Sequence, residues 1–247
     1  MMEKTLYLKC APGDVGDLVL LTGDPGRVER AARQLSDVQT IAQNREFITM
    51  TGTYKGQKVS VVSSGIGAPS AAIAIEELAQ LGARAIVRFG TMMGISAKLG
   101  SYMIASGAVR YEGTSEHYLP CEYPAVPHWS LMQALYQKSR ERGLETHVGV
   151  TATYDAFYPK MAPALVGRGL PDMEQLQQGQ VIAVDMETAL LFVAGARLRV
   201  ATAAMCLVTN EADPFAIIAP EAHAAGETRL VTTVLDALVD WSSTDAG

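Results

Sequence analysis

The stretch Ala85-Ile86-Val87-Arg88-Phe89-Gly90-Thr91 sets three apolar residues directly before a cation, a glycine and a hydroxyl. The apolar residues predict a buried strand that ends at Arg88. A buried guanidinium is stable only when an anion or a carboxylate meets it. The strand can therefore place Arg88 and Thr91 against a bound anion, at the sheet edge where open α/β folds bind ligands. The alternative is that Arg88 forms an ordinary internal ion pair with a carboxylate.

Strand and helix patterns continue on both sides of this stretch. A glycine-rich turn at 65–67 opens an apolar helix over 71–81, so residues 59–90 predict a βαβ unit with a parallel strand pair. The chain shows no repeat and no linker, which favours one α/β domain over residues 1–247. Further strands are expected at 18–21, 48–54, 58–63, 102–110, 147–152, 181–184 and 200–209, further helices at 28–35, 130–142, 188–198 and 227–241, and a surface excursion at 162–179.

Composition excludes several classes of function. The 247 residues carry a net charge of -6, with a sequence pI near 5.3, which disfavours nucleic acid and anionic membranes as partners. The amino-terminal segment lacks the apolar core of a signal peptide, and no apolar run is long enough to span a bilayer. Cys10, Cys121 and Cys206 have no metal-type spacing, so we expect a cytoplasmic protein without a bound metal.

A second candidate anion site follows the first predicted strand. Thr22-Gly23-Asp24-Pro25-Gly26-Arg27 combines a glycine turn with a helix start, in which Asp24 is the expected N-cap and Pro25 lies near N1. Free N–H groups and the helix dipole attract anions there, and Arg27 would add charge-assisted bonds. A capped helix with an exposed arginine is the simpler interpretation of this hexapeptide.

Two more segments carry candidate ligand contacts. Asp185 and Glu187 follow a predicted strand two residues apart, so both carboxylates point to one side, where they would grip a sugar diol or act as acid and base. They are equally typical of a helix start stabilised by its dipole. The aromatic segment 154–159 would stack on a planar ligand, or form a satellite apolar cluster.

Six motifs appear in order along the chain: Gly23-Asp24-Pro25-Gly26-Arg27, Asn44-Arg45-Glu46-Phe47, Gly65-Ile66-Gly67-Ala68-Pro69-Ser70, Glu76-Glu77-Leu78, Arg88-Phe89-Gly90-Thr91 and Asp185-Met186-Glu187. Together they resemble one enzyme family, the nucleoside phosphorylases that include uridine phosphorylases and hexameric purine nucleoside phosphorylases. The resemblance runs over roughly residues 5–240, and residues 110–118, 123–126, 147–152 and 157–159 favour the uridine branch.

This resemblance implies a three-layer α/β fold with a central mixed sheet flanked by helices, assembled as a hexamer, a trimer of dimers. It also implies phosphorolysis of a nucleoside to free base and (deoxy)ribose 1-phosphate, with inorganic phosphate as co-substrate and no cofactor. The implied phosphate ligands are Gly23, Arg27, Arg88 and Thr91, joined by Arg45 from the neighbouring subunit.

The remaining roles follow from the same resemblance. Glu187 would bind the ribose hydroxyls and Met186 would pack beneath the sugar, while Tyr7 would reach the ribose from the partner subunit. Phe157 would contact the base. The implied catalytic residues are Arg88, Glu187 and Asn210.

The base-binding half departs from the family pattern. Asn210 stands where purine-type members carry a proton-donating aspartate, and Glu211 follows it where uridine phosphorylases have an arginine. Met161 and Pro163 replace the glutamine and arginine that read the uracil edge, and Met93 stands where a glycine is usual. Base contacts are thus expected from Met93, Phe157, Met161, Asn210 and Glu211, with fewer hydrogen bonds to reject a wrong base.

Several functions remain open from the sequence. A uridine or related pyrimidine nucleoside phosphorylase comes first, and a purine nucleoside phosphorylase is the main substrate alternative. A hydrolytic nucleosidase of the same fold has no need of the phosphate arginines. A nucleoside-binding protein with little catalysis is compatible with the altered base pocket.

Overall fold

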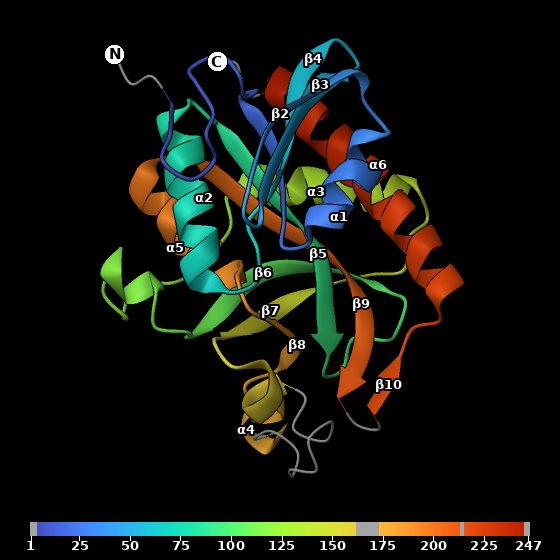
Figure 1. The fold of residues 1–247 in the computed structure, drawn as a ribbon. Coiled ribbons are helices and arrows are strands. Elements are labelled where there is room, and N and C mark those ends of the chain that lie inside the picture. Colours follow the sequence, from blue (N-terminus) through green and yellow to red (C-terminus); the bar gives the residue numbers. More distant parts are fainter. Residues whose placement is uncertain (1–3, 162–172, 213–214, 245–247) are drawn as a thin grey trace.

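The computed structural model describes residues 4–161, 173–212 and 215–244. Its elements alternate strands and helices, as the sequence predicts for an α/β fold (Figure 1). They are β1 (Leu18–Thr22), α1 (Pro25–Ala32), β2 (Ser36–Asn44), β3 (Phe47–Tyr54), β4 (Gln57–Ser63), α2 (Ala68–Gln80), β5 (Ala85–Gly94), β6 (Tyr102–Tyr111), η1 (Ser115–His117), α3 (Trp129–Glu141), β7 (Thr146–Tyr154), η2 (Phe157–Met161), α4 (Met173–Gln178), β8 (Val181–Asp185), α5 (Thr188–Leu198), β9 (Ala201–Ala212), β10 (Phe215–Ile217) and α6 (Pro220–Thr244).

These strands form one mixed sheet in the order β10-β9-β6-β7-β8-β5-β1-β4-β3-β2. Strands β4, β1, β5 and β9 run parallel as neighbours, because β5 also pairs directly with β9. The predicted parallel pair within 59–90 is corrected: β1 lies between β4 and β5, so the crossover through α2 spans an intervening strand. The pattern of apolar residues predicts where strands lie in the sequence, but it does not predict the order of the strands in the sheet.

The strand that contains Arg88 is longer than predicted. β5 continues to Gly94 because β9 pairs with it along its whole length. β1 pairs with β5 only as far as Leu21 opposite Arg88. Arg88 therefore lies inside a strand, at the point where the neighbouring strand has ended and its side of the sheet opens.

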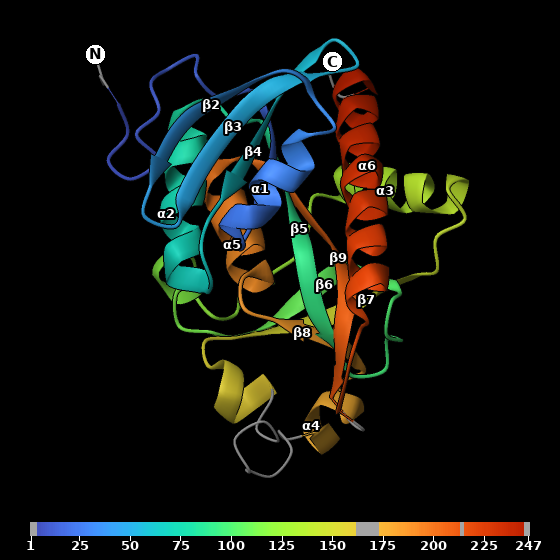
Figure 2. The same ribbon diagram turned by 45° about the vertical axis from the view of Figure 1, so that its right-hand side comes forward.

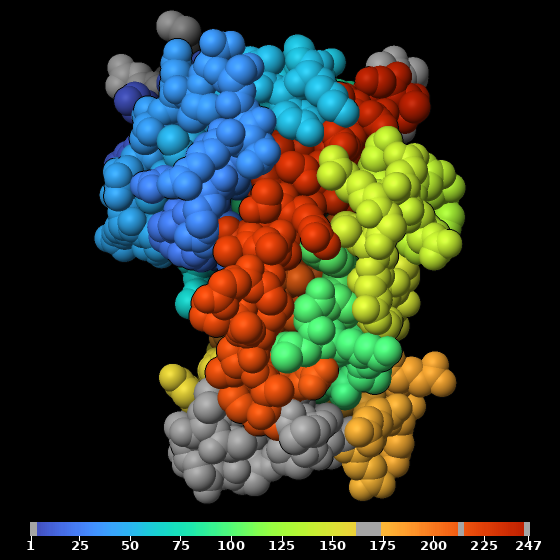
Figure 3. Space-filling view, turned by 90° about the vertical axis from the view of Figure 1, so that its right-hand side faces the viewer, coloured from blue at the N-terminus to red at the C-terminus, as the bar shows by residue number. Residues whose placement is uncertain are grey.

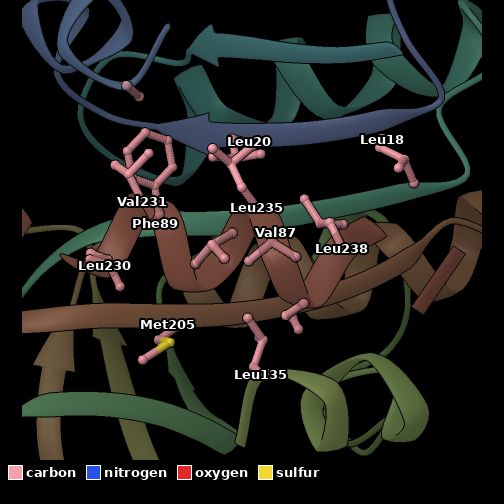
Figure 4. Packing of buried hydrophobic residues seen from close by; sticks show 14 of the residues in the cluster. Leu18, Leu20, Val87, Phe89, Leu135, Met205, Leu230, Val231, Leu235 and Leu238 are labelled. Atoms are coloured by element: carbon pink, nitrogen blue, oxygen red, sulfur yellow. The ribbon is translucent and has the colours of Figure 1, made fainter. Parts of the chain in front are cut away.

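Helices cover both faces of the sheet (Figure 1, Figure 2). Alternate residues of β1 face opposite layers: Leu18 and Leu20 pack with α1, α3 and α6, whereas Val19 and Leu21 pack with α2 and α5. Figure 4 shows the first layer, in which Leu235 of α6 lies near Leu20 and Val87 of the sheet. The predicted three-layer fold with a central mixed sheet is confirmed.

Other boundaries differ from the sequence prediction. The last helix begins at Pro220 rather than 227, and it crosses one face between the β2–β3 region and α3 (Figure 3). Strands β2 and β10 were not predicted, because β2 is mostly polar and exposed and β10 spans three residues. Part of the predicted excursion, Met173–Gln178, is the helix α4, and residues 162–172 lie outside the described ones. Within the described ranges no helix has the length and apolarity required to cross a membrane.

Candidate active site

A cavity of about 710 Å³ opens at the carboxyl ends of the parallel strands β4, β1, β5 and β9. This is the edge at which α/β sheets bind ligands, because turns and helix starts converge there. Its lining combines polar and apolar side chains. The described residues that line it are Gly23, Asp24, Pro25, Arg27, Glu46, Gly65, Ile66, Ser70, Arg88, Thr91, Met92, Met93, Phe157, Met161, Asp185, Met186, Glu187, Thr209 and Asn210.

The turn after β1 brings Arg27 to the cavity. Helix α1 begins at Pro25, and Asp24 caps it by accepting a bond from the Gly26 N–H, as the sequence predicts. The side chain of Arg27 is buried, with its Nε 2.9 Å from Glu227 Oε2 and its Nη1 2.8 Å from Thr22 Oγ1. The simpler interpretation of this hexapeptide, with the arginine exposed, is therefore wrong.

Arg88 enters the same cavity from β5. Its guanidinium contacts the carboxylate of Glu187 directly, and its Nη2 lies 3.3 Å from Asp185 Oδ2. Its Nη1 donates to Cys206 Sγ at 2.8 Å. Burial acts to lower the pKa of Arg88, but Cys206, Glu187 and Asp185 keep that pKa above its usual value. Arg88 therefore belongs to an internal ion-pair cluster and also faces a cavity.

The two arginines meet above a glycine. A Cβ atom at Gly90 would lie 3.3 Å from Arg88 Nη1 and 3.5 Å from Arg27 Nη1. Like charges brought this close repel one another, which favours an anion between or beside them. The hydroxyl-bearing Thr91 and the turn at Gly23 also line this cavity. The part of the cavity where the two arginines meet suits an anion such as phosphate, because guanidinium N–H groups bind phosphate oxygens well.

Beside the arginines lies a pair of buried carboxylates. Glu187 Oε1 accepts a bond from the Gly67 N–H at 2.6 Å, so the glycine turn positions the carboxylate toward the cavity. Asp185 also lines the cavity and contacts Arg88, but its oxygens additionally accept from the hydroxyls of Thr188 and Thr153, the latter at 2.8 Å from Asp185 Oδ1. Asp185 thus accepts from the N–H of Thr188, the first residue of α5, whereas Glu187 lines the cavity with its carboxylate bound by Gly67 and Arg88. Binding of sugar hydroxyls by Glu187 stays a prediction.

Farther along β5 than Arg88, the lining of the cavity is mostly apolar. Met93 from β5, Phe157 and Met161 from η2 line it together with Asn210 from β9. The Thr209 hydroxyl donates to Asn210 Oδ1 at 2.9 Å, which leaves the amide NH₂ as the group that can donate to a ligand. The predicted aromatic loop is thus a short helical turn at Phe157–Met161.

Comparison with known proteins places the chain in a family. A sequence model described as the phosphorylase superfamily matches residues 17–240. The chain belongs to the phosphorylase superfamily.

Named members of the superfamily differ in the base that their names specify. A uridine phosphorylase from Thermococcus kodakarensis is 40% identical over 200 residues, covering 75% of this chain and 70% of the relative. A guanosine phosphorylase from Halorubrum lacusprofundi is 35% identical over 209 residues, covering 84% and 83%. The crystal structure of a uridine phosphorylase from Vibrio fischeri superposes with a TM-score of 0.86 at 28% identity, covering 97% of this chain and 98% of that one.

Arg45, Tyr7 and Glu211 are predicted site residues, but they are not among the described residues that line the cavity. Arg45 stacks above the ring of Tyr7, with 5.7 Å from its guanidinium carbon to the ring centre, so the two form a separate unit. Glu211 Oε1 accepts a bond from the Leu99 N–H at 2.8 Å. Pro163 lies outside the described residues.

Sequence reasoning missed residues that support the site from elsewhere in the chain. Glu227 pairs with Arg27 although 200 positions separate them, and Cys206 contacts Arg88 from the adjacent strand. Burial raises the pKa of the Cys206 thiol to about 11. Neither residue stands in a recognisable motif, and only packing of distant segments reveals them.

Proposed function

We propose that this chain is a nucleoside phosphorylase, which uses inorganic phosphate to cleave the N-glycosidic bond of a nucleoside. The observation that carries the proposal is one cavity in a superfamily member, with Arg27, Arg88 and Thr91 at one end and an apolar pocket ending in Asn210 at the other. Glu187 lines the same cavity and contacts Arg88, so a ribose bound at its carboxylate would link a phosphate held by the arginines to a base in the apolar pocket.

The chemistry follows from this order of groups. Cleavage develops positive charge on the sugar and negative charge on the departing base. A phosphate held by Arg27 and Arg88 attacks the anomeric carbon and stabilises the developing cation, mainly through positioning and preorganised charge. Glu187 holds the sugar hydroxyls in reacting geometry, and the Asn210 amide donates to the departing base. Asn210 has no proton to transfer as an acid, so its contribution is a hydrogen bond.

The leading candidate substrate is uridine or a related pyrimidine nucleoside. The uridine phosphorylase from Thermococcus kodakarensis supports it with 40% identity. A purine nucleoside is the second candidate, because the guanosine phosphorylase from Halorubrum lacusprofundi is 35% identical over a longer share of the chain. The donor amide of Asn210 is compatible with carbonyl acceptors on either kind of base.

Hydrolysis and simple binding are weaker alternatives. A hydrolase replaces phosphate by water and gains nothing from two buried arginines beside the sugar. A binding protein gains nothing from charges placed at the sugar's reactive face. The buried ion pairs of Arg27 and Arg88 therefore favour phosphorolysis.

The decisive experiment measures release of free base from purine and pyrimidine nucleosides, with and without phosphate. We expect turnover that requires phosphate and yields ribose 1-phosphate. Turnover that ignores phosphate would identify a hydrolase, and tight nucleoside binding without turnover would identify a binding protein.

Arg45 and Tyr7 support a shared active site between two subunits of a homo-oligomer, proposed to be a hexamer built as a trimer of dimers. Both residues lie on one side of the chain outside its own cavity lining, with Tyr7 held by Glu77 and Asn44 through its backbone. Their proposed targets are the phosphate and the ribose of the partner.

Subunit mixing tests this arrangement. Arg45→Ala and Glu187→Ala subunits, each inactive alone, should regain part of the wild-type activity when exchanged into mixed dimers, since some sites then contain both residues. Confirmed exchange without any recovery would contradict the shared site.

The proposed reaction takes place in a single-domain protein of the cytoplasm. A single domain carries it, supported by the one sheet that joins every described strand. The reaction takes phosphate as co-substrate and requires no cofactor or metal for its chemistry. A cytoplasmic location is supported by the free thiols of Cys10, Cys121 and Cys206.

A further inference from the structure

Glu227 lies on α6, outside the described lining of the cavity, and pairs with the cavity residue Arg27. Its carboxylate is buried and shared by two arginines of α1. Oε2 accepts from Arg27 Nε at 2.9 Å, and Oε1 accepts from Arg30 Nε at 2.5 Å. Arg30 in turn contacts Asp24, the N-cap residue of the same helix.

These contacts determine how Arg27 faces the cavity. Of the five N–H groups of its guanidinium, Nε is bound by Glu227 and one on Nη1 by Thr22. Nη2 has no partner among the described residues, and Arg27 lines the cavity. A planar guanidinium held at two of its nitrogens cannot rotate, so its remaining N–H groups keep one direction.

We propose that Glu227 is a positioning residue for phosphate: it locks the Arg27 guanidinium so that its free N–H groups face the co-substrate. The inference rests on the phosphorylase function proposed above. Glu227 does not touch the substrate in this arrangement. It acts through Arg27 alone, and Thr22 supplies the second point of attachment.

Electrostatics alone predicts the opposite effect of removing Glu227. A carboxylate close to a phosphate site repels the anion, so its neutralisation would strengthen phosphate binding. Orientation predicts weaker binding, because an unheld arginine must be ordered at the moment phosphate binds. The sign of the change therefore separates a positioning role from a role in charge balance.

Asp236 offers a matched control on the same helix. Its carboxylate is buried to a similar degree and also accepts from cations, with Arg142 Nη2 at 2.5 Å and Lys55 Nζ at 2.7 Å. Arg142 is the C-cap residue of α3 and Lys55 lies in the β3–β4 turn, and neither lines the cavity. Asp236→Asn therefore reproduces the loss of a buried carboxylate from α6 without changing Arg27.

The experiment measures binding of inorganic phosphate by calorimetry and then steady-state kinetics for wild type, Glu227→Gln, Glu227→Asp and Asp236→Asn. We expect Glu227→Gln to raise the phosphate Kd and the phosphate KM at least tenfold, with the nucleoside KM within about twofold. Glu227→Asp should recover part of the loss, and Asp236→Asn should bind phosphate like wild type.

Chemical rescue by small carboxylates provides a second test. Restored phosphate binding is expected if Glu227 orients Arg27, but not if Glu227 only stabilises the fold. A hollow of about 600 Å³, lined by Glu227, Arg30 and His223, opens beside this carboxylate. Formate or acetate should therefore enter the space left in Glu227→Ala and restore phosphate binding in a dose-dependent way. The same anions should leave wild type unchanged or weaken it by competing with phosphate.

The outcomes separate the inference from the function on which it rests. Wild type that binds no phosphate would refute the phosphorylase proposal together with the inference. Phosphate binding that is intact in wild type and equal or tighter in folded Glu227→Gln would overturn the role of Glu227 alone. Equal weakening in Asp236→Asn would overturn it too, because the loss would then reflect α6 as a whole.

Discussion

The two ends of the cavity differ in the chemistry of their side chains: one is charged and the other is mostly apolar. At the phosphate end, Arg27 and Arg88 are each tied to buried carboxylates and converge above Gly90. At the base end, Met93 and Met161 surround a single amide, Asn210. Charged groups with fixed partners demand one geometry, whereas flexible thioether side chains adapt to the shape they meet.

This difference bears on specificity. A site of paired hydrogen bonds rejects a ligand that leaves its polar groups unsatisfied, while an apolar pocket discriminates by only about 1–3 kcal/mol per methylene group. We therefore expect strict recognition of phosphate and ribose, and broader acceptance of bases. The predictions below test this contrast, in order of decreasing effect.

Replacing Arg88 should give the largest loss. Arg88→Ala removes a cation from the reacting centre and leaves Asp185 and Glu187 buried without it. We expect kcat/KM for phosphorolysis to fall by at least about 100- to 1,000-fold. The control is Arg84→Ala, which removes a half-exposed arginine paired with Asp17 at the other end of the segment. Near-normal turnover of a folded Arg88→Ala enzyme would contradict the phosphate role.

Crowding the two arginines should give an intermediate loss. The methyl group of Gly90→Ala would lie 3.3 Å from Arg88 Nη1, closer than ordinary van der Waals contact, and 3.5 Å from Arg27 Nη1, so the Arg88 guanidinium must shift away from its place beside Arg27. We expect the phosphate KM to rise about tenfold, a loss of about 1.4 kcal/mol, while the nucleoside KM changes little. A larger change in the nucleoside KM than in the phosphate KM would contradict the assignment of separate ends to phosphate and base.

Changes at the base end should be smaller and should affect the other substrate. Met161→Leu conserves an apolar side chain of similar volume and should keep kcat/KM within about threefold. Met161→Gln places an amide in the pocket, and we expect it to change the ranking of nucleosides by several-fold with an unchanged phosphate KM. Kinetics over a nucleoside panel provide the measurement, and an unchanged ranking would contradict the proposed contact.

The smallest expected effect concerns acid stability. Burial acts to raise the pKa of Glu227, but hydrogen bonds from Arg30 and Arg27 outweigh it and hold that pKa below 4.5. A depressed folded pKa contributes stability that is present above about 4.5 and lost as pH falls through the folded value. The Tm difference between wild type and Glu227→Gln should thus be widest near pH 7 and narrow below pH 4.5. A constant difference would contradict the ion pair.

The predicted fold is confirmed, and most of the predicted site residues line one cavity, where the sequence signal is local. Strand patterns, the Asp24 cap and the motifs around Arg88, Asp185 and Glu187 are stretches of a few residues whose chemistry constrains their neighbours. The boundaries of β5 and α6 were less predictable, since pairing with β9 and packing on the sheet extend them. Propensity determines where an element can form, and tertiary contacts determine where it ends.

By itself, the sequence determined an α/β fold, the segments that reach the cavity and the charged residues that they carry. Only the tertiary structure decided that β1 inserts between β4 and β5, that two arginines meet above Gly90 and that Glu227 holds one of them. Hydrophobic period and turn chemistry are properties of adjacent residues. The partner of a buried charge is chosen instead by the packing of segments that lie far apart in the chain.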